Sequence, residues 1–261
     1  MSILDLFKKK HYVVIVSCGQ SLAIATDQSS LSARRQLDLS NDHTIKLWSY
    51  LPDVVGQTTT AWTALDVASK EYESMGRAAA RRYAYYGYNV ALIEVAVGGM
   101  GLNAYWKKGQ SGYTVLTGQI TTALTALARW GTTWEWGFFL RYQAHADCAT
   151  IAGADTYAGL LPTHLADLRA DLPSATDLHF VIARAPDWGV AVGRLGLDTI
   201  RAAQVSIADA DENASWIDTD GILLPGTDGI ISWGTSHDGV HPTACGRASV
   251  GIRAADHYEE L

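Results

Sequence analysis

The sequence predicts an α/β protein, a three-layer α/β/α sandwich around a central, mostly parallel sheet. Segments that are apolar at nearly every position alternate with segments of helix length, and the apolar ones lie at residues 12–16, 90–97, 136–142 and 178–183. Strands of this kind are typical of sheets that are covered on both faces. Because parallel neighbours need crossover connections, the alternation predicts helices in both outer layers.

The helices are predicted from apolar residues at helical spacing and from residues that end helices. Segment 65–86 carries apolar residues three or four positions apart and stops at Gly87. Further helices are predicted at 114–130, 155–172, 197–210 and 243–258. Segment 27–60 is rich in Ser, Thr and Asp, and only 45–50 is apolar enough for a strand, so we expect an irregular segment near the site.

Composition limits the class of protein and its partners. The 261 residues are 48% apolar and 18% charged, which predicts one globular domain over residues 1–261. A net charge of −7 argues against nucleic acid or an anionic membrane as a partner and favours a neutral substrate. The oligomeric state is left open.

Neither export nor a metal is expected from the sequence. The amino-terminal apolar segment at 12–16 is too short for a signal peptide, and no segment has membrane-spanning length. Localisation therefore stays open, with the cytoplasm as the default and a virion as an alternative. The three cysteines contain no CxxC pair, so neither a disulfide framework nor a zinc knuckle is indicated.

Ser21 is the candidate nucleophile. It follows an apolar strand and Gly19, where a buried strand turns into a helix. A serine on such a turn is exposed at the carboxyl edge of the sheet, above a helix amino-terminus that favours negative charge. The same residues also suit a polar turn in which Ser21 caps the next helix, so the serine alone does not decide. The Cys18 thiol is a rival nucleophile, although a thiol within a strand end is expected to be buried and inert.

Asp238 and His241 are the candidate partners of the serine. Their spacing across a tight turn lets the carboxylate meet Nδ1 of the imidazole while Nε2 points to Ser21. The alternative is a polar pair in a loop without a catalytic role. His237, directly before the aspartate, is expected to point elsewhere.

Glycines after the 90–97 segment suit an oxyanion pocket. At Gly98 and Gly99 the backbone can approach a ligand closely and aim its N–H groups at developing negative charge. Gly99-x-Gly101-x-x-Ala104 also matches a loose dinucleotide pattern, but the acidic residue which that pattern expects about 20 positions later is missing. A tight structural turn is the remaining alternative.

Gln143 ends the 136–142 segment with an amide that can donate to an oxyanion without adding charge. His145 and Asp147 follow it and would be possible metal ligands. Two such residues without a third nearby do not make a metal site, so no metal is expected.

In this order the segments resemble the SGNH hydrolases, and more closely their branch of sialate O-acetylesterases and acetylxylan esterases. Residues 19–22 match that branch's Gly-Gln-Ser-Asn block, and 98–106 match its Gly-Gly block that ends in Trp. Residues 143–147 stand where the branch has Gln-Gly-Glu-Ser-Asp, and 201–204 match an Arg-x-Ala-Gln stretch. Residues 238–242 supply the closing Asp-x-x-His-Pro block, so the resemblance spans nearly the whole chain.

The resemblance implies the flavodoxin-like SGNH fold and a serine esterase that removes O-acetyl groups from a carbohydrate through an acyl-enzyme, with no cofactor. In it Ser21 is the nucleophile, His241 the base and Asp238 the orienting acid. The oxyanion donors are the Ser21 N–H, the Gly99 N–H and the Gln143 amide, with Gly98 as the alternative if the loop register differs by one.

An acetylated carbohydrate is the implied partner. Gln20, Trp106 and Trp233 are expected to bind it, and the rings of Trp48 and Trp62 lie in segments near the same motifs. Tryptophans present flat faces to sugar rings, although packing in the core is the commoner role for any one of them.

Three departures from the branch pattern surround the reacting carbonyl: Leu22, Met100 and the pair Ala144-His145. They bear on the oxyanion pocket and on the acyl or sugar preference, whereas the nucleophile, base and acid are kept. The alternatives are a lipase-like or thioester hydrolase of the same superfamily, and a catalytically vestigial carbohydrate-binding module of a larger, for example viral, assembly.

Overall fold

The computed structural model describes residues 10–19, 44–53, 58–65, 73–129, 131–187, 194–220 and 244–261. The predicted site residues Gln20, Ser21, Trp233, Asp238 and His241 lie outside the described residues. The elements that surround them in the sequence are described, and these carry the argument below.

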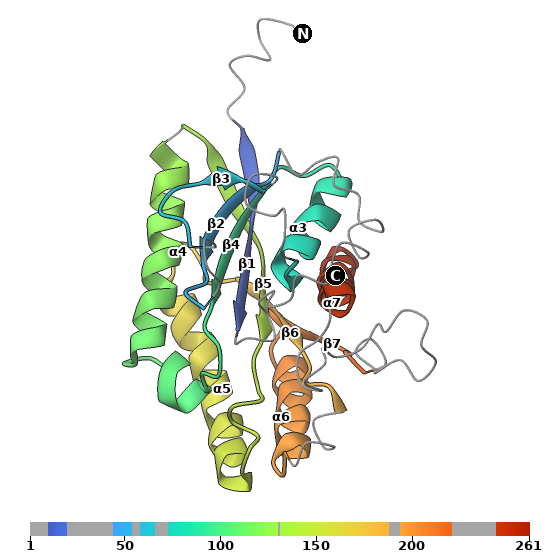
Figure 1. Ribbon diagram of the computed structural model, residues 1–261. Coiled ribbons are helices and arrows are strands. Elements are labelled where there is room, and N and C mark those ends of the chain that lie inside the picture. The colour runs from blue at the N-terminus through green and yellow to red at the C-terminus, as the bar shows by residue number, and fades with distance from the viewer. Residues whose placement is uncertain are drawn as a thin grey trace, which may run out of the picture.

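Within the described residues, seven strands form one sheet in the order β3-β2-β4-β1-β5-β6-β7 (Figure 1). Their bounds are β1 His11–Gly19, β2 Lys46–Tyr50, β3 Thr63–Ala64, β4 Val90–Ala96, β5 Thr133–Tyr142, β6 His179–Ala183 and β7 Ala214–Ile217. Every neighbouring pair is parallel except β2 with β3. The predicted mostly parallel sheet is therefore confirmed.

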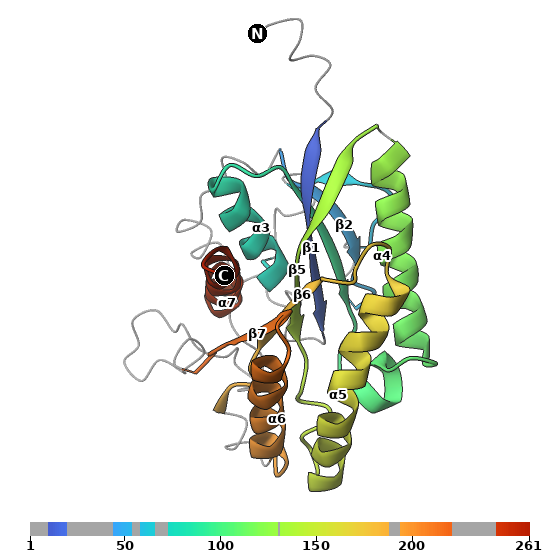
Figure 2. The same cartoon turned by 180° about the vertical axis from the view of Figure 1, so that it is seen from behind.

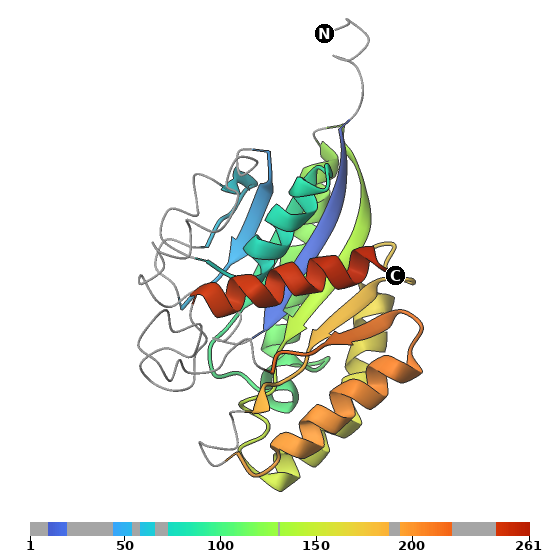
Figure 3. The same cartoon turned by 90° about the vertical axis from the view of Figure 1, so that its right-hand side faces the viewer.

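Helices cover both faces of the sheet (Figures 1 and 2). They are α3 Met75–Tyr85, α4 Ser111–Arg129, α5 Ile151–Asp171, α6 Leu197–Ala210 and α7 Ala244–Glu259. Residues of α4, α5 and α6 pack with Val14 and Val16 of β1, whereas residues of α3 and α7 pack with Val13 and Ile15. Figure 3 shows α7 crossing over the sheet beside α3. This arrangement confirms the three-layer sandwich.

One predicted helix is wrong in its extent. We expected a single helix over 65–86, but Ser74 has an extended backbone and α3 begins only at Met75. The Ser74 hydroxyl accepts the Arg77 N–H at 3.0 Å, which is the standard contact of a residue that caps a helix amino-terminus. The predicted stop holds, because Gly87 takes a positive φ of 98° directly after the helix.

The sequence analysis missed the shortest elements. The edge strands β3 and β7 have two and four residues, too few to show a period of two. A π-helical turn, η3 Leu102–Trp106, also went unpredicted because its hydrogen-bond pattern has no signature in apolar spacing. In the ranges that are described, no helix combines the length and apolarity needed to cross a membrane.

Candidate active site

The strand register brings two of the predicted segments to the place where β1 ends. Gly19, the last residue of β1, lies level with Ala96 of β4 on one side and with Tyr142 of β5 on the other. The Val97 N–H donates to the Gly19 carbonyl at 3.2 Å and extends this alignment by one residue. The residues that follow these three strands therefore start from one edge of the sheet, which is where parallel α/β folds bind ligands.

The loop after β4 holds its two glycines differently. The Gly98 N–H donates to Asp53 Oδ2 at 2.5 Å and is thereby occupied. Gly99 is exposed and has a φ of 68°, a conformation that favours glycine. Its N–H has no hydrogen-bond partner among the described residues. Of the two candidates, Gly99 is the one with an N–H left for a ligand.

The turn η3 fixes the far side of this loop. The Leu102 N–H donates to both carboxylate oxygens of Asp147 at 3.0 Å, which satisfies an otherwise unpaired donor at the start of the turn. Trp106 Nε1 donates back to the Met100 carbonyl at 3.2 Å. A Cβ on Gly101 would lie only 2.7 Å from Asp147 Oδ1, so this close approach requires glycine.

Gln143 follows β5 and is 2% exposed. Its amide nitrogen donates to Asp147 Oδ2 at 2.5 Å, and its amide oxygen accepts from Arg141 Nη2 at 3.4 Å. Its backbone carbonyl accepts from the Tyr157 hydroxyl at 3.2 Å. Both ends of the side chain and its backbone are thus held in place.

Asp147 is a buried carboxylate that accepts hydrogen bonds from both Leu102 and Gln143. Burial raises its pKa above the usual value, while hydrogen bonds from Leu102 and Gln143 and the positive charge of Arg141 act in the opposite direction. Among the residues that the structure describes, no group of three His, Cys, Asp or Glu side chains is arranged to hold a metal ion.

The Cys18 thiol is completely buried within β1. Burial raises its pKa to about 12, although the nearby charge of Arg141 lowers it. A thiol with this pKa is protonated at neutral pH and is a poor nucleophile. The structure therefore argues against Cys18 as a rival to a serine.

The prediction that Trp106 contacts the sugar is wrong. Trp106 is 0% exposed and packs in the core, so its ring offers no face to a sugar. Trp48 and Trp62 are also buried, stand edge to face with centroids 5.8 Å apart, and are hydrogen-bonded through their indole nitrogens to α4. All three tryptophans therefore pack in the core with a hydrogen-bonded indole N–H, which is the commoner role for this residue.

The helix that follows the predicted His241 in the sequence packs against the amino-terminal end of α3. Arg247, in the first turns of α7, donates through Nε to the Glu73 carbonyl at 2.9 Å. Glu73 directly precedes Ser74, the cap of α3, and in the first turn of α3 a Cβ on Gly76 would lie 2.6 Å from the Cβ of Ser17 in β1. The start of α7 is therefore fixed near the carboxyl half of β1.

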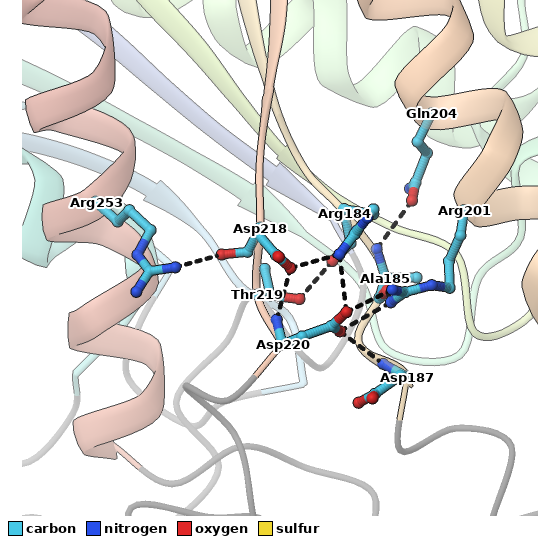
Figure 4. A network of polar contacts seen from close by, with 9 residues as sticks. All are labelled: Arg184, Ala185, Asp187, Arg201, Gln204, Asp218, Thr219, Asp220 and Arg253. Atoms are coloured by element: carbon cyan, nitrogen blue, oxygen red, sulfur yellow. Dashed lines mark hydrogen bonds and ion pairs between the residues drawn. The ribbon is translucent and has the colours of Figure 1, made fainter.

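A charged network joins the ends of β6 and β7 to two helices (Figure 4). Arg184, directly after β6, donates to Asp218 and Asp220 at 2.6 and 2.8 Å. Arg201 of α6 donates to both carboxylate oxygens of Asp220. Arg253 of α7 donates to the Asp218 carbonyl at 2.9 Å. The network fixes Asp220, the last described residue before the part of the sequence that contains the predicted Asp-x-x-His pair.

The family model described as "Carbohydrate esterase, sialic acid-specific acetylesterase" matches residues 59–260. The chain belongs to this carbohydrate esterase family. It is thus a carboxylic ester hydrolase, and the resemblance to the sialate O-acetylesterase branch is confirmed. A search of curated protein sequences found no significant match to the esterase.

Solved structures agree with the esterase in fold. A protein from Arabidopsis thaliana has a TM-score of 0.68 at 19% identity, with 97% of the esterase and 98% of that chain covered. The structure of NanS has a TM-score of 0.68 at 12% identity, with 97% and 98% covered. A carbohydrate acetylesterase from Xanthomonas citri has a TM-score of 0.63 at 18% identity; the match covers 93% of the esterase but only 54% of that longer chain.

Sequence reasoning named Gly99 and Gln143 but missed the residues that hold them. Asp147 was named as a possible metal ligand and as the last residue of the matched block 143–147, without a role in the pocket, and no role was predicted for Asp53 or Arg141. The position of Asp147 in the same short motif as Gln143 was an available signal. No local signal marks Asp53, because its contact with Gly98 joins residues 45 positions apart.

Proposed function

We propose that the esterase removes O-acetyl groups from a carbohydrate by serine catalysis. Ser21 attacks the acetyl carbonyl, His241 takes the Ser21 proton, and Asp238 orients the imidazole and stabilises its charged form. The alcohol of the sugar leaves with the proton that His241 returns to it. Water then hydrolyses the acetyl-enzyme with His241 again as the base, and acetate is released.

The strand register at the end of β1 is the observation that carries this proposal. Gly19 lies level with the ends of β4 and β5. Ser21 is two residues further on, and two extended residues span at most about 7 Å. Gly99 and Gln143 follow β4 and β5 at the same edge of the sheet, and their N–H groups are proposed to point at the carbonyl that Ser21 attacks.

The oxyanion of the tetrahedral intermediate would be stabilised by three donors, the N–H groups of Ser21 and Gly99 and the amide of Gln143. The Gly98 N–H is occupied by Asp53, which favours Gly99 over its neighbour. Uncharged donors that are already in position stabilise developing charge without reorganisation, and one such donor contributes about 10²–10³ in kcat.

Gln20 and Trp233 are proposed to contact the sugar, because they flank Ser21 and the Asp238–His241 pair in the sequence. Trp106 is not included because it is buried. Which sugar and which acetylated position are bound would be decided by a screen of acetylated xylan, sialic acids and amino sugars in which released acetate is measured.

The Ser21→Ala variant tests the nucleophile. With p-nitrophenyl acetate we expect kcat/KM to fall by on the order of 10⁴-fold or more, because loss of one member disables the triad as a unit. Equal hydrolysis by wild type and Ser21→Ala would remove Ser21 as nucleophile. Absence of hydrolysis in both, with retained binding of the carbohydrate, would favour a vestigial binding module.

A pair of histidine variants tests the base. His241→Ala is expected to lose most turnover, whereas the matched control His237→Ala keeps much of it. The reverse result would exchange the two assignments. Faster turnover of long-chain esters or thioesters than of acetylated sugars would favour the lipase-like alternative.

A further inference from the structure

We propose that Asp147 is a positioning residue for the oxyanion pocket. Its carboxylate orients the Gln143 amide by direct contact, and it fixes the loop that carries Gly99 through the Leu102 N–H. This inference deepens the proposed function and rests on it. Asp147 comes five positions after the end of β5, and the residue is 8% exposed.

Asp147 and Arg141 together set the orientation of the Gln143 amide. A carboxylate only accepts hydrogen bonds and a guanidinium only donates them. With Asp147 on one side and Arg141 on the other, a single orientation satisfies both: the amide nitrogen faces Asp147 at 2.5 Å and the amide oxygen faces Arg141 at 3.4 Å. The opposite orientation would place donor against donor and acceptor against acceptor.

This orientation leaves one N–H of the amide available. The only other contact of the Gln143 nitrogen within the described part of the chain is the Met100 carbonyl, at 3.5 Å. Like the 3.4 Å contact of Arg141 with the amide oxygen, this hydrogen bond is long, so an oxyanion at a shorter distance would compete for the second N–H. The second N–H therefore lies on the side of the glycine loop, where the proposed oxyanion would form, and Asp147 is the group that turns it there.

Asp147 also holds the loop that follows β4. Both oxygens of Asp147 accept the Leu102 N–H, three residues after Gly99. The backbone N–H of Asn103 interacts with the same carboxylate. The carboxylate thus holds the start of η3, and Trp106 at the end of η3 donates to the Met100 carbonyl. Together these contacts fix the backbone that follows Gly99.

One carboxylate makes both sets of hydrogen bonds, and this distinguishes Asp147 from a residue that only caps a helix. A cap would need only the backbone N–H groups of η3. Here one side chain joins the loop after β4 to the side chain that follows β5, so the distance between the two proposed donors depends on it. In metal sites, residues that orient the ligands commonly affect activity by about 10–100-fold, and we expect an effect of the same order for a residue that orients an oxyanion donor.

The test begins with Asp147→Asn. The asparagine oxygen can still accept from Leu102, but its NH₂ group faces the donor of Gln143, so the amide loses its preferred orientation. With p-nitrophenyl acetate we expect kcat to fall about 10–100-fold while KM changes less than about twofold, because the interaction lost acts in the transition state. An unchanged kcat would overturn the inference.

A double-mutant cycle separates positioning from a general loss of structure. Gln143→Ala alone should lower kcat by about 10²–10³-fold. Because Asp147→Asn keeps the acceptor for Leu102, its effect should pass through Gln143, and in the Gln143→Ala background it should lower kcat by less than about threefold more, since coupled residues are not additive. A full further 10–100-fold loss in that background would overturn the coupling. Asp155→Asn, the same change at an exposed position of α5, is the matched control and should keep full kcat.

A second variant covers the case in which Asp147→Asn does not fold. Gly101→Ala keeps every polar group but places a methyl about 2.7 Å from Asp147 Oδ1, which must move the carboxylate. We expect a fall in kcat of about tenfold, with the thermal unfolding midpoint measured alongside. Wild-type kcat in Gly101→Ala would overturn the inference.

Ser21→Ala, assayed in parallel, distinguishes the two proposals. If Ser21→Ala is inactive and Asp147→Asn is fully active, only the inference fails. If wild type and Ser21→Ala hydrolyse the ester equally, the proposed function fails and the inference fails with it.

Discussion

Two charged networks lie toward the carboxyl edge of the sheet, and they differ in their exposure to water. The inner network lies between β4, α3 and α7 and comprises Glu73, Ser74, Arg77, Arg81, Glu94 and Arg247. The outer network, shown in Figure 4, links Arg184 and Arg201 to Asp218 and Asp220. The Arg77 and Glu94 side chains are 1% and 3% exposed, whereas those of Arg184 and Asp218 are 16% and 47% exposed.

How much each network contributes to the free energy of unfolding depends on its burial and not on its number of ion pairs. In the inner network a charge that loses its partner stays buried, and this costs far more than the pair contributed as a whole. In the outer network water and salt ions can replace the missing partner. Both networks tie a helix to a strand end, but only the inner one is expected to be indispensable for folding.

The largest expected effect is on Glu94, which accepts from Ser74 and from Arg77 Nε at 3.1 Å. Glu94→Gln keeps the shape of the side chain but removes a buried negative charge that accepts a hydrogen bond from the Arg77 guanidinium. We expect the free energy of unfolding to fall by about 3–5 kcal/mol, measured by urea denaturation. Glu135→Gln, the same change at an exposed position of β5, should leave the midpoint unchanged.

A smaller effect is expected in the outer network. Asp220→Asn keeps an acceptor for Arg201 and weakens contacts that are partly open to solvent, with the Asp220 side chain 26% exposed. The free energy of unfolding should fall by about 1 kcal/mol. A loss as large as that of Glu94→Gln would contradict the comparison between the networks.

The smallest effect is the response of the outer network to pH and salt. Burial raises the pKa of Asp220, but hydrogen bonds from Arg201 and the Asp187 N–H outweigh it and leave the pKa below 3.8. The stabilisation is therefore complete above that unfolded value and is lost as the pH falls through the lower folded value.

Urea titrations of wild type and Asp220→Asn between pH 6 and pH 3 test this directly. The difference in the free energy of unfolding should stay constant down to about pH 4 and then shrink. About 1 M salt should reduce the difference at pH 6 by screening. A difference that grows on acidification would show that Asp220 is not held ionised by its arginines.

The order of strands and helices followed from local pattern. The segments at 90–97 and 178–183 are apolar at nearly every position and became β4 and β6, because burial on both faces leaves that mark on the sequence. The two-residue β3 and the turn η3 left no mark. The extent of α3 was decided by Ser74, whose cap lies inside a stretch that otherwise has helical spacing.

By itself, the sequence determined the fold class, the family and the motifs that name Ser21, Gly99, Gln143, Asp238 and His241, because these depend on residues close together along the chain. Only the tertiary structure decided that Trp106 is buried, that the Gly98 N–H donates to Asp53, and that Asp147 joins the loop after β4 to Gln143. Contacts such as Asp147 with Leu102 join residues 45 positions apart, and they exist only because the parallel register places the ends of β4 and β5 on either side of β1. Periodicity along a chain reports which face of an element is buried, but it carries no information on which distant side chain meets that face.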